Sequence, residues 1–427
     1  MVGGVPSPSS AALGRSLADA DAAADWARSG VVHLTGRPDG PPLVPPGHGA
    51  TRARELAHAI AAATAGTRCP VSVDGPALLA ERAAFTGHVR RGPVSPGGSC
   101  RLLPTADGWA AVSCARDVDP QLLSALVSAE LGADPWPGVA DWLRVHPGSD
   151  LAERAQLLGI AAAPVHRPPP PPPFPAHPPR SVDGLLVVDF SALWAGPLCA
   201  ALLGLAGARV VKVETPSRPD GARRGDPAFY RLLHAGHRSV VLDPELPAER
   251  RALAALVAAA DIVIEASRPR ALAGFGLDAA AAVADGTTWI SITAAGRDSA
   301  RVGFGDDVAA GAGLVVADDV GAPLFCGDAL ADPLTGLTAA ALALTAPADG
   351  SGVLWDVAMA DVVAATLPDG PEQAPRAAEA SASGWVLETD AGQVPVARPR
   401  GRTVAGTAPA AGAHTAEVLG ELGIPLP

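Results

Sequence analysis

The chain has 427 residues, 48% of them hydrophobic, so it is long enough to bury one large core or two moderate ones. Its formal net charge of −12 argues against nucleic acid and anionic membranes as partners, and no apolar run is long enough to cross a bilayer. The five cysteines lie far apart without metal-ligand spacing, and the N-terminus has no export signal. This pattern indicates reduced thiols, no metal site and a cytoplasmic location.

The segment 1–165 mixes predicted helices and strands and is expected to form an N-terminal α+β domain. Residues 100–114 alternate in hydrophobicity around Asp107-Gly108, which predicts a β-hairpin. Gly159 is expected to end the last helix of this domain. Helices are predicted at 54–64, 76–85, 120–131 and 150–158.

A run of six prolines, 168–173, gives the clearest boundary in the chain. Such a run forms an extended polyproline II segment and cannot join a hydrophobic core. A docking peptide for another protein is the other interpretation of a proline run, but a linker between domains is the commoner one. We therefore predict a linker over 166–182.

After the linker, short apolar β-branched runs alternate with Ala-rich helical segments. This alternation predicts an α/β domain over 183–366, with an open, mostly parallel sheet and helices on both faces. Residues 367–427 are expected to form a C-terminal loop and a closing helix over 414–422. Strands are predicted at 185–190, 209–214, 238–242, 261–265 and 288–293, and helices at 196–206, 247–260 and 333–345.

Ligands of open parallel sheets bind at the carboxyl ends of the strands, and two such ends are notable in this sequence. The turn 190–197 leads into a helix whose free N–H groups suit a phosphate or carboxylate. The segment 264–270 places two arginines around a proline just after a strand, and guanidinium groups suit phosphate. An ordinary βα turn and solvated surface arginines are the alternatives that either segment leaves open by itself.

A third strand-to-helix connection, 327–336, contains Asp332 directly before Pro333. This order favours Asp332 as an N-cap with proline at the first helical position. The functional alternative is a carboxylate held at the helix start as a nucleophile that attacks an activated carbonyl. The local sequence alone favours the structural interpretation.

Between 183 and 361 the chain resembles the class III CoA-transferases, the family of formyl-CoA transferase and carnitine CoA-transferase. Each matching piece is short, but their order and spacing agree with the family. The tail 412–423 is also similar to the closing helix of that family. The matching pieces are 187–197, 207–214, 237–243, 260–269, 290–293, 330–336 and 355–361.

The resemblance implies that Asp332 is the catalytic aspartate, which attacks an acyl-CoA thioester and passes CoA to an acceptor carboxylate. It implies acyl-CoA as substrate, no permanently bound cofactor and a homodimer. Backbone N–H groups of 327–332 are expected to stabilise the developing oxyanion. The residues that the resemblance places around CoA are Ala192, Leu193, Trp194, Ala195, Arg218, Arg238, Ala266, Ser267, Arg268 and Arg301.

The order of the pieces departs from the family. The family carries a small domain between the region matching Ala360 and the closing helix, whereas in this chain 95–165 resembles that small domain at the other end. Gly97 and Gly98 then match the glycine loop that closes over the active-site aspartate. The resemblance therefore implies a rearranged member, joined through the proline run.

Alternatives to a transferase remain open. Trp194 and the pair Ala266-Ser267 differ from the family's usual residues, and we expect Trp194 to crowd a small acceptor such as oxalate. The racemase branch of the family uses a histidine that is absent from 303–310, although Asp306 or Asp307 could act as the base. A non-catalytic CoA-binding relative is a third interpretation, and a dinucleotide dehydrogenase lacks its glycine fingerprint.

Overall fold

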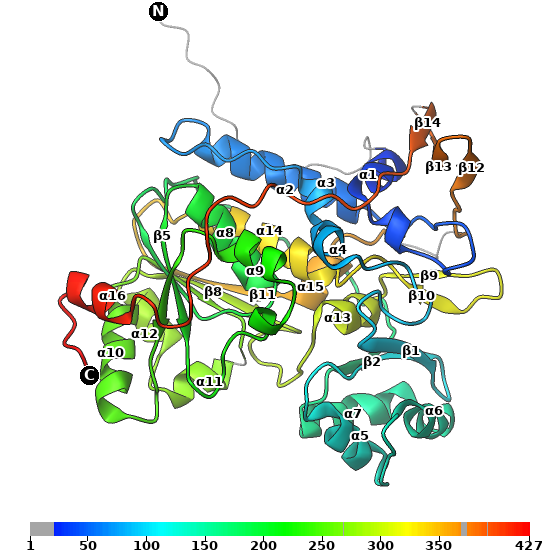
Figure 1. The fold of residues 1–427 in the computed structure, drawn as a ribbon, viewed down its shortest axis with the longest axis horizontal. Helices are drawn as coiled ribbons and strands as arrows, with labels where there is room; N and C mark the ends of the chain where they lie inside the picture. The colour runs from blue at the N-terminus through cyan, green and yellow to red at the C-terminus, as the bar shows by residue number, and fades with distance from the viewer. Residues whose placement is uncertain (1–20, 268, 369–373, 391) are drawn as a thin grey trace, which may run out of the picture.

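A six-stranded parallel sheet forms the centre of the molecule in this computed structural model, which describes residues 21–267, 269–368, 374–390 and 392–427 (Figure 1). The strand order β11-β8-β7-β4-β5-β6 leaves β11 and β6 at the two edges. The predicted α/β class with an open parallel sheet is therefore confirmed. The strands are β4 (Leu186–Asp189), β5 (Arg209–Glu214), β6 (Arg238–Val241), β7 (Ile262–Glu265), β8 (Thr288–Thr293) and β11 (Val353–Ala358).

Helices cover both faces of the sheet, because the apolar strands are buried on both sides. On one face, α8 (Ala195–Leu205) and α14 (Ala331–Ala343) pack against each other and share the largest hydrophobic core. On the other face, α10 (Pro247–Ala258), α12 (Ala279–Ala284) and α16 (Thr415–Glu421) enclose a second core around Trp289. The predicted closing helix corresponds to α16.

The N-terminal helices join the main core rather than a domain of their own. In Figure 1 these helices lie beside α8 and α14. Trp26, Leu56 and Leu79 are buried in the same cluster as the residues of α8 and α14. The expectation of one domain over 1–165 is thus wrong for its first half, because the apolar face of these helices needs the α/β body as a partner. These helices are α1 (Ala22–Ser29), η3 (Val32–Leu34), α2 (Gly49–Thr64), α3 (Gly75–Leu78) and α4 (Glu81–Thr86).

Residues 95–165 form a separate lobe, which we call the hairpin lobe (Figure 1). It has its own core around Leu123 and Leu143. The predicted hairpin is confirmed, and a third strand pairs antiparallel with it. A helix that we did not predict, α6, also covers this sheet. The elements are β1 (Cys100–Pro104), β2 (Trp109–Ser113), β3 (Ala162–Pro164), α5 (Asp119–Val127), α6 (Trp136–Val145) and α7 (Gly148–Leu158).

The proline-rich linker, 166–182, is docked along the body instead of crossing open solvent. The Phe174 and His177 rings contact Trp355 of the edge strand β11. The backbone N–H of Arg180 donates to the carbonyl of Leu344 at 2.8 Å. A proline run has no N–H groups to add to the sheet, so it covers this edge without extending it.

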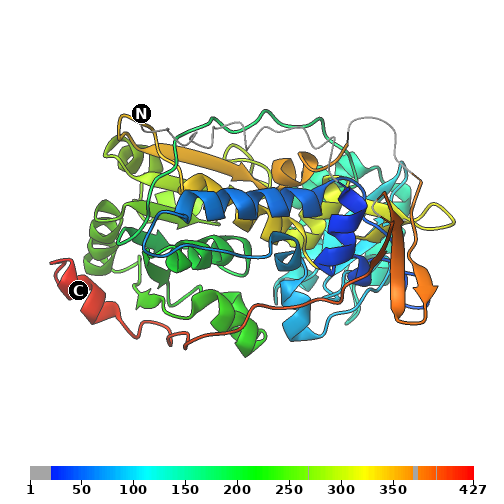
Figure 2. The ribbon, with the colours of Figure 1, turned by 90° about the horizontal axis from the view of Figure 1, so that it is seen from above.

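The C-terminal region differs from the loop that we predicted over 367–385. Its described residues include a three-stranded antiparallel sheet packed beside α1, made of β12 (Glu379–Ser381), β13 (Gly384–Thr389) and β14 (Gly392–Pro395). The chain then crosses the molecule as a segment that we call the C-terminal arm, 396–414. Viewed from above, the arm and the proline linker run along opposite sides of α2 (Figure 2).

The arm is fastened at both ends. Arg402 donates three hydrogen bonds of 2.8 to 2.9 Å to the buried carboxylate of Glu81 in α4. At its other end, the backbone N–H of His414 donates to the carbonyl of Ser239, so the arm covers the outer edge of β6. The arm thereby joins the N-terminal helices to the far edge of the sheet.

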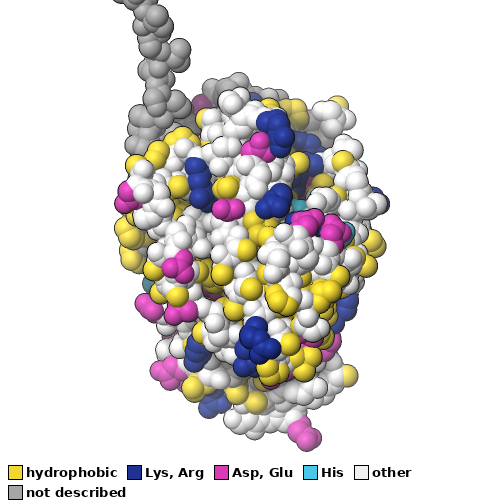
Figure 3. Space-filling model, turned by 90° about the vertical axis from the view of Figure 1, so that its left-hand side faces the viewer, with side chains coloured by type: hydrophobic (Ala, Val, Ile, Leu, Met, Phe, Trp, Pro, Cys, Tyr) yellow, Lys and Arg dark blue, Asp and Glu magenta, His cyan; other side chains and the backbone are white. Residues whose placement is uncertain are grey.

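The remaining described elements are short connections around the body. They are η4 (Gly221–Arg224), α9 (Pro227–His234), α11 (Pro269–Gly274), α13 (Gly305–Gly311), β9 (Val315–Ala317), β10 (Pro323–Phe325) and α15 (Met359–Ala364). Within the part of the chain that is described, no helix is long and apolar enough to pass through a bilayer. On the face shown in Figure 3, acidic and basic side chains are scattered among hydrophobic ones.

Replacing Arg402 tests whether the arm stabilises the fold. In Arg402→Ala the Glu81 carboxylate, which is 1% exposed, loses its cationic partner. We expect the free energy of unfolding at pH 7 to fall by about 3 kcal/mol, because a buried charge is left uncompensated. Urea unfolding measures this. The matched control Arg144→Ala removes an exposed pair with Asp141 and should cost less than about 1 kcal/mol; equal losses would contradict the assigned role of the arm.

Candidate active site

Four aspartates come together where helices α13 and α14 begin. Asp306 and Asp307 lie in the first turn of α13, Asp328 precedes α14, and Asp332 lies in the first turn of α14. The backbone N–H of Ala329 donates to Asp306 Oδ1 at 2.8 Å and so connects the two helix starts. We call these four side chains the acidic cluster.

Asp332 is not the N-cap that we predicted, because α14 begins one residue earlier, at Ala331. The N–H of Asp332 donates to the carbonyl of Ala329 at 2.9 Å, and Ala329 turns the chain with φ 51°. Pro333 still fits in the first turn, where its missing N–H has no helical partner to lose. The Asp332 carboxylate therefore caps nothing and has no hydrogen bond to any described side chain or backbone group.

Gly305 holds the backbone of α13 against the Asp332 carboxylate. A Cβ at Gly305 would clash with Asp332 Oδ2 and would lie 2.6 Å from the carbonyl oxygen of Ala329. Asp332 as a residue is only partly buried.

The environment of Asp332 keeps its carboxyl group partly protonated near neutral pH. Burial raises its pKa to about 7, the Arg82 guanidinium opposes this rise, and Asp306 and Asp328 add to it. Burial likewise raises the pKa of Asp306 to about 6 and that of Asp307 to about 6. These shifts follow from holding several carboxylates together away from water.

The N-terminal helices supply the cation of the site. Arg82 of α4 donates from Nε to Asp328 Oδ2 at 2.8 Å and from Nη2 to Oδ1 at 2.6 Å. His88 Nδ1 lies 3.2 Å from the same carboxylate. Burial acts to raise the pKa of Asp328, but the Arg82 guanidinium outweighs it and holds the pKa well below its ordinary value. Asp328 is thus the member of the cluster that stays ionised to the lowest pH.

The hairpin lobe closes the site from another side. A Cβ on Gly97 would lie 3.4 Å from His88 Cε1 and 4.0 Å from Arg82 Nη2, whereas Gly98 faces Arg91. Ser113 Oγ of β2 donates to Asp307 Oδ1 at 3.0 Å, and both side chains are buried. Gly97 therefore lies beside the two residues that contact Asp328, whereas Gly98 does not.

The turn between β4 and α8 lies next to α14. The carbonyl oxygen of Ala195 faces Gly336, one turn after Asp332, so closely that a Cβ there would lie 2.7 Å away. Trp194 is 1% exposed, and its ring contacts Phe229 and the guanidinium of Arg82, 5.2 Å from the ring centroid. The indole of Trp194 is therefore packed against Phe229 and Arg82, and the expectation that it crowds a small acceptor stays a prediction.

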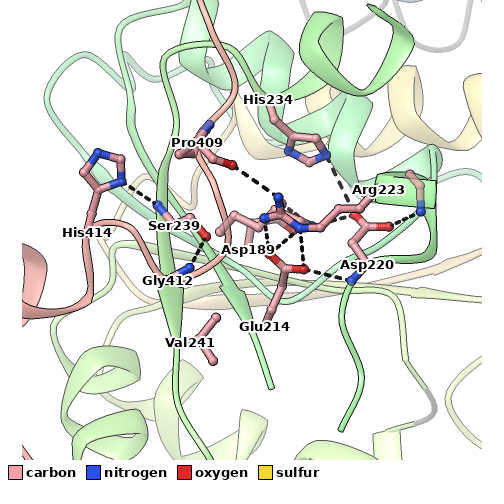
Figure 4. A network of polar contacts seen from close by, with 12 residues as sticks. Asp189, Glu214, Asp220, Arg223, His234, Ser239, Val241, Pro409, Gly412 and His414 are labelled. Carbon is pink, nitrogen blue, oxygen red and sulfur yellow. Dashed lines mark hydrogen bonds and ion pairs between the residues drawn. The ribbon is translucent and has the colours of Figure 1, made fainter. Parts of the chain in front are cut away.

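A buried ionic network sets the shape of this turn (Figure 4). Lys212 Nζ donates to the carbonyl of Ser191 at 2.7 Å and lies 2.9 Å from Asp220 Oδ2. Asp220 Oδ1 accepts from the N–H of Leu193, which has φ 69°. Lys212, the single lysine of the chain, thus holds Leu193 in a strained conformation at the carboxyl end of the sheet.

A second part of the network ties it to the C-terminal arm (Figure 4). Arg223 binds both carboxylate oxygens of Glu214 and donates to the carbonyl of Pro409 at 3.2 Å. Nearby, burial lowers the pKa of His237 to about 3 and that of His234 well below its ordinary value. Both imidazoles are therefore neutral at pH 7.

The arginines predicted to bind CoA have different surroundings. Arg238 pairs with Glu421 of α16 at 2.5 Å, and its contact with CoA stays a prediction. Arg218 is exposed, and Arg268 lies outside the described residues. Arg301 lies beside Asp307, and its Nε and Nη2 are buried without a hydrogen-bond partner among the described residues.

The two small residues after β7 also fall at the carboxyl end of the sheet. Ala266 is exposed, and Ser267 Oγ is buried without a described hydrogen-bond partner. Among the described residues, no three His, Cys, Asp or Glu side chains are grouped as metal ligands.

The sequence interpretation missed Arg82 and His88. They contact an aspartate 246 and 240 residues further along the chain, and a single sequence carries no local signal for such a pairing. Gly305 lies inside a segment that is notable in sequence for its aspartates, but nothing in the local pattern indicates its contact with Asp332.

Comparison with known proteins agrees with this arrangement. The family model described as CoA-transferase family III matches residues 182–396, just over half of the 427 residues. The chain belongs to this family. The matched region contains the sheet, the turn before α8 and the acidic cluster, whereas Arg82 and the hairpin lobe lie outside it.

Individual relatives match over shorter stretches. The chain is 30% identical over 214 residues to a succinate–glutarate CoA-transferase of Agrobacterium fabrum, which covers 44% of this chain and 53% of that protein. It is 33% identical over 100 residues to a formyl-CoA:oxalate CoA-transferase of Rhodopseudomonas palustris, covering 22% of this chain and 24% of that protein. The chain thus matches about half or less of the length of these relatives.

Among solved structures, a CaiB/BaiF family protein from Brucella suis is 28% identical. The similarity covers 51% of this chain and 65% of that one, with a TM-score of 0.43.

The raised pKa of Asp332 predicts a pH-dependent gain of stability in Asp332→Asn. The folded protein holds this proton from about pH 4 to about 7, so its free energy of unfolding falls as pH rises through that window. We expect Asp332→Asn to be more stable than the unchanged protein at pH 8 by up to about 4 kcal/mol, because asparagine carries no charge to bury and each pKa unit corresponds to about 1.4 kcal/mol. The difference should vanish near pH 4.

Urea unfolding at pH 4, 6 and 8 measures this difference, with Asp141→Asn on the exposed surface of α6 as the control. A gain that is the same at all three pH values would mean that Asp332 has an ordinary pKa.

Proposed function

We propose that the protein is a CoA-transferase that moves CoA between carboxylic acids through a covalent intermediate on Asp332. The observation that carries this proposal is the state of that side chain. Asp332 is partly open to solvent, engages in no hydrogen bond with a described residue and lies beside a fixed guanidinium. A carboxylate with these properties is free to attack an activated carbonyl.

The proposed reaction proceeds by four acyl exchanges. Asp332 attacks the thioester carbonyl, the C–S bond breaks and CoA leaves as a thiolate, giving a mixed anhydride. The thiolate then attacks the Asp332 carbonyl and releases the first acid, leaving an aspartyl-CoA thioester. The acceptor carboxylate attacks this thioester to form a second anhydride, and the thiolate attacks the acceptor carbonyl, which forms the new acyl-CoA and regenerates Asp332.

The surrounding groups support these steps in different ways. Arg82, 25% exposed on its side chain, holds Asp328 ionised and lowers the pKa of Asp332, which favours the nucleophilic form. Gly305 leaves no room for a side chain over the attacking carboxylate. The matched relatives bear names that pair CoA with succinate, glutarate, formate or oxalate, and this supports short carboxylic acids as the substrate class of this protein.

Trapping the intermediate tests the proposal. We expect a panel of short acyl-CoAs, quenched with hydroxylamine, to leave a hydroxamate on the peptide containing Asp332, detected by mass spectrometry. Asp332→Asn should give none, whereas Asp141→Asn, on the surface of the hairpin lobe, should keep it. Turnover of the acyl-CoAs without any trapped peptide would contradict the covalent route.

A mixing experiment tests whether one chain provides the whole site. Arg82, His88 and Asp332 come from the same chain in this structure. We therefore expect that mixing inactive Asp332→Ala with inactive Arg82→Ala restores no activity, even if the protein is the homodimer that the family resemblance implies. Recovery of about a quarter of the activity after refolding the two together would show instead that the partner chain supplies Arg82.

A second candidate function is proton transfer at the α-carbon of an acyl-CoA. The observation that favours it is the pair Asp306 and Asp332, two neighbouring carboxyl groups with pKa values raised to about 6 and about 7. Groups in this range can exchange protons at neutral pH. Incorporation of deuterium at the α-carbon in heavy water, without CoA transfer, would favour this function, and CoA binding with neither reaction would indicate a non-catalytic relative.

A further inference from the structure

A cavity of about 380 Å³ lies where the N-terminal helices meet the C-terminal arm. It is separate from the acidic cluster, since none of its lining residues belongs to that cluster or contacts it through a described hydrogen bond. Four chain segments converge on it, namely α1, α2, the start of α3 and the arm. The polar side chains that line it are Asp25, Arg28, Arg54, His58, Asp74 and Arg400.

Two of the three arginines are already neutralised by aspartates. Arg54 donates from Nε and Nη2 to the buried carboxylate of Asp25, at 3.1 and 3.0 Å. Arg400 donates to Asp74 Oδ2 at 2.5 Å. These pairs fix the walls of the cavity in place.

Arg28 has no acidic partner among the described residues. Its side chain is exposed at the last turn of α1, while its carbonyl accepts from Arg400 Nη1 at 2.7 Å. This hydrogen bond holds the Arg400 guanidinium against the backbone carbonyl of Arg28. With three arginines against two aspartates, the lining carries a net charge of +1 before His58 is counted, in a chain whose net charge is −12.

The rest of the lining is apolar. Ala57, Val73, Pro76 and Ala397 contribute most of it. A small inorganic anion would leave this apolar surface in contact with water, whereas an organic anion would cover it. Guanidinium groups suit carboxylates because their N–H donors match the two oxygens.

We propose that this cavity binds a small organic carboxylate, with Arg28 as its main ionic contact and the apolar lining against its carbon skeleton. Such a ligand contacts the arm and the helices at once and fastens the arm to the body. Arg400, which lines the cavity, is two residues from Arg402, which clamps Glu81 beside Arg82. The cavity is therefore placed to stabilise the segment that supplies Arg82.

The experiment is a titration of the full chain with succinate, followed by calorimetry and by thermal unfolding at constant ionic strength. We expect saturable binding that raises the unfolding temperature, since a ligand of the folded state stabilises it. Arg28→Gln should weaken this binding at least tenfold, because it removes the main ionic contact of the ligand. The variant should keep its fold, since the Arg28 side chain is exposed. Arg144→Gln, which removes an exposed arginine on α6, should leave it unchanged.

Three results would overturn the proposal. They are binding of succinate no tighter than that of chloride at the same ionic strength, binding that persists in Arg28→Gln, and binding of inorganic phosphate as tight as that of succinate. The last result would mean that charge alone, and not an organic skeleton, decides binding. Because Arg28 lies outside the acidic cluster, loss of binding in Arg28→Gln with intact trapping at Asp332 also separates this site from the proposed catalytic one.

Discussion

The ion pair between Arg82 and Asp328 is the interaction on which the proposed site depends. Four carboxyl groups gather at the start of α13 and α14, where Arg301 lies beside Asp307 and the Arg82 guanidinium of the N-terminal helices pairs with Asp328. Without that cation, Asp328 would have to be protonated or exposed, because an isolated buried charge is strongly unfavourable. The pair therefore decides how the proton is shared among Asp306, Asp328 and Asp332.

The remaining architecture serves to deliver that cation. Arg82 belongs to a segment far from the acidic cluster in sequence, so its position depends on how the N-terminal helices are held on the body. Their apolar faces pack into the same core as α8 and α14. The C-terminal arm then clamps Glu81, the residue next to Arg82, through Arg402. Two interactions thus place Arg82 at the site in this rearranged chain. One is the packing of the N-terminal helices on the body, and the other is the buried ion pair between Arg402 and Glu81.

Much of the α/β body could be predicted from the sequence. The strands β5 and β8 have the predicted bounds, because continuous β-branched runs between Gly and Pro signals leave little choice. Strands β12 to β14 were missed, because an Ala- and Pro-rich composition hides short alternating runs. The start of α14 was misplaced by two residues, since the turn at Ala329 is not visible in sequence. Pairings such as Arg82 with Asp328 depend on tertiary packing and leave no local pattern.

The most direct test of this account is the pKa of Asp332, measured from the carboxyl signal of protein labelled with 13C-aspartate and assigned with Asp332→Asn. We predict a value of about 7 in the unchanged protein. In Arg82→Gln, whose fold is checked by near-ultraviolet circular dichroism, we predict a higher value, because the cation that favours the ionised form is gone. A value near 4 in both proteins would contradict the central role of the acidic cluster and of Arg82 in the proposed site.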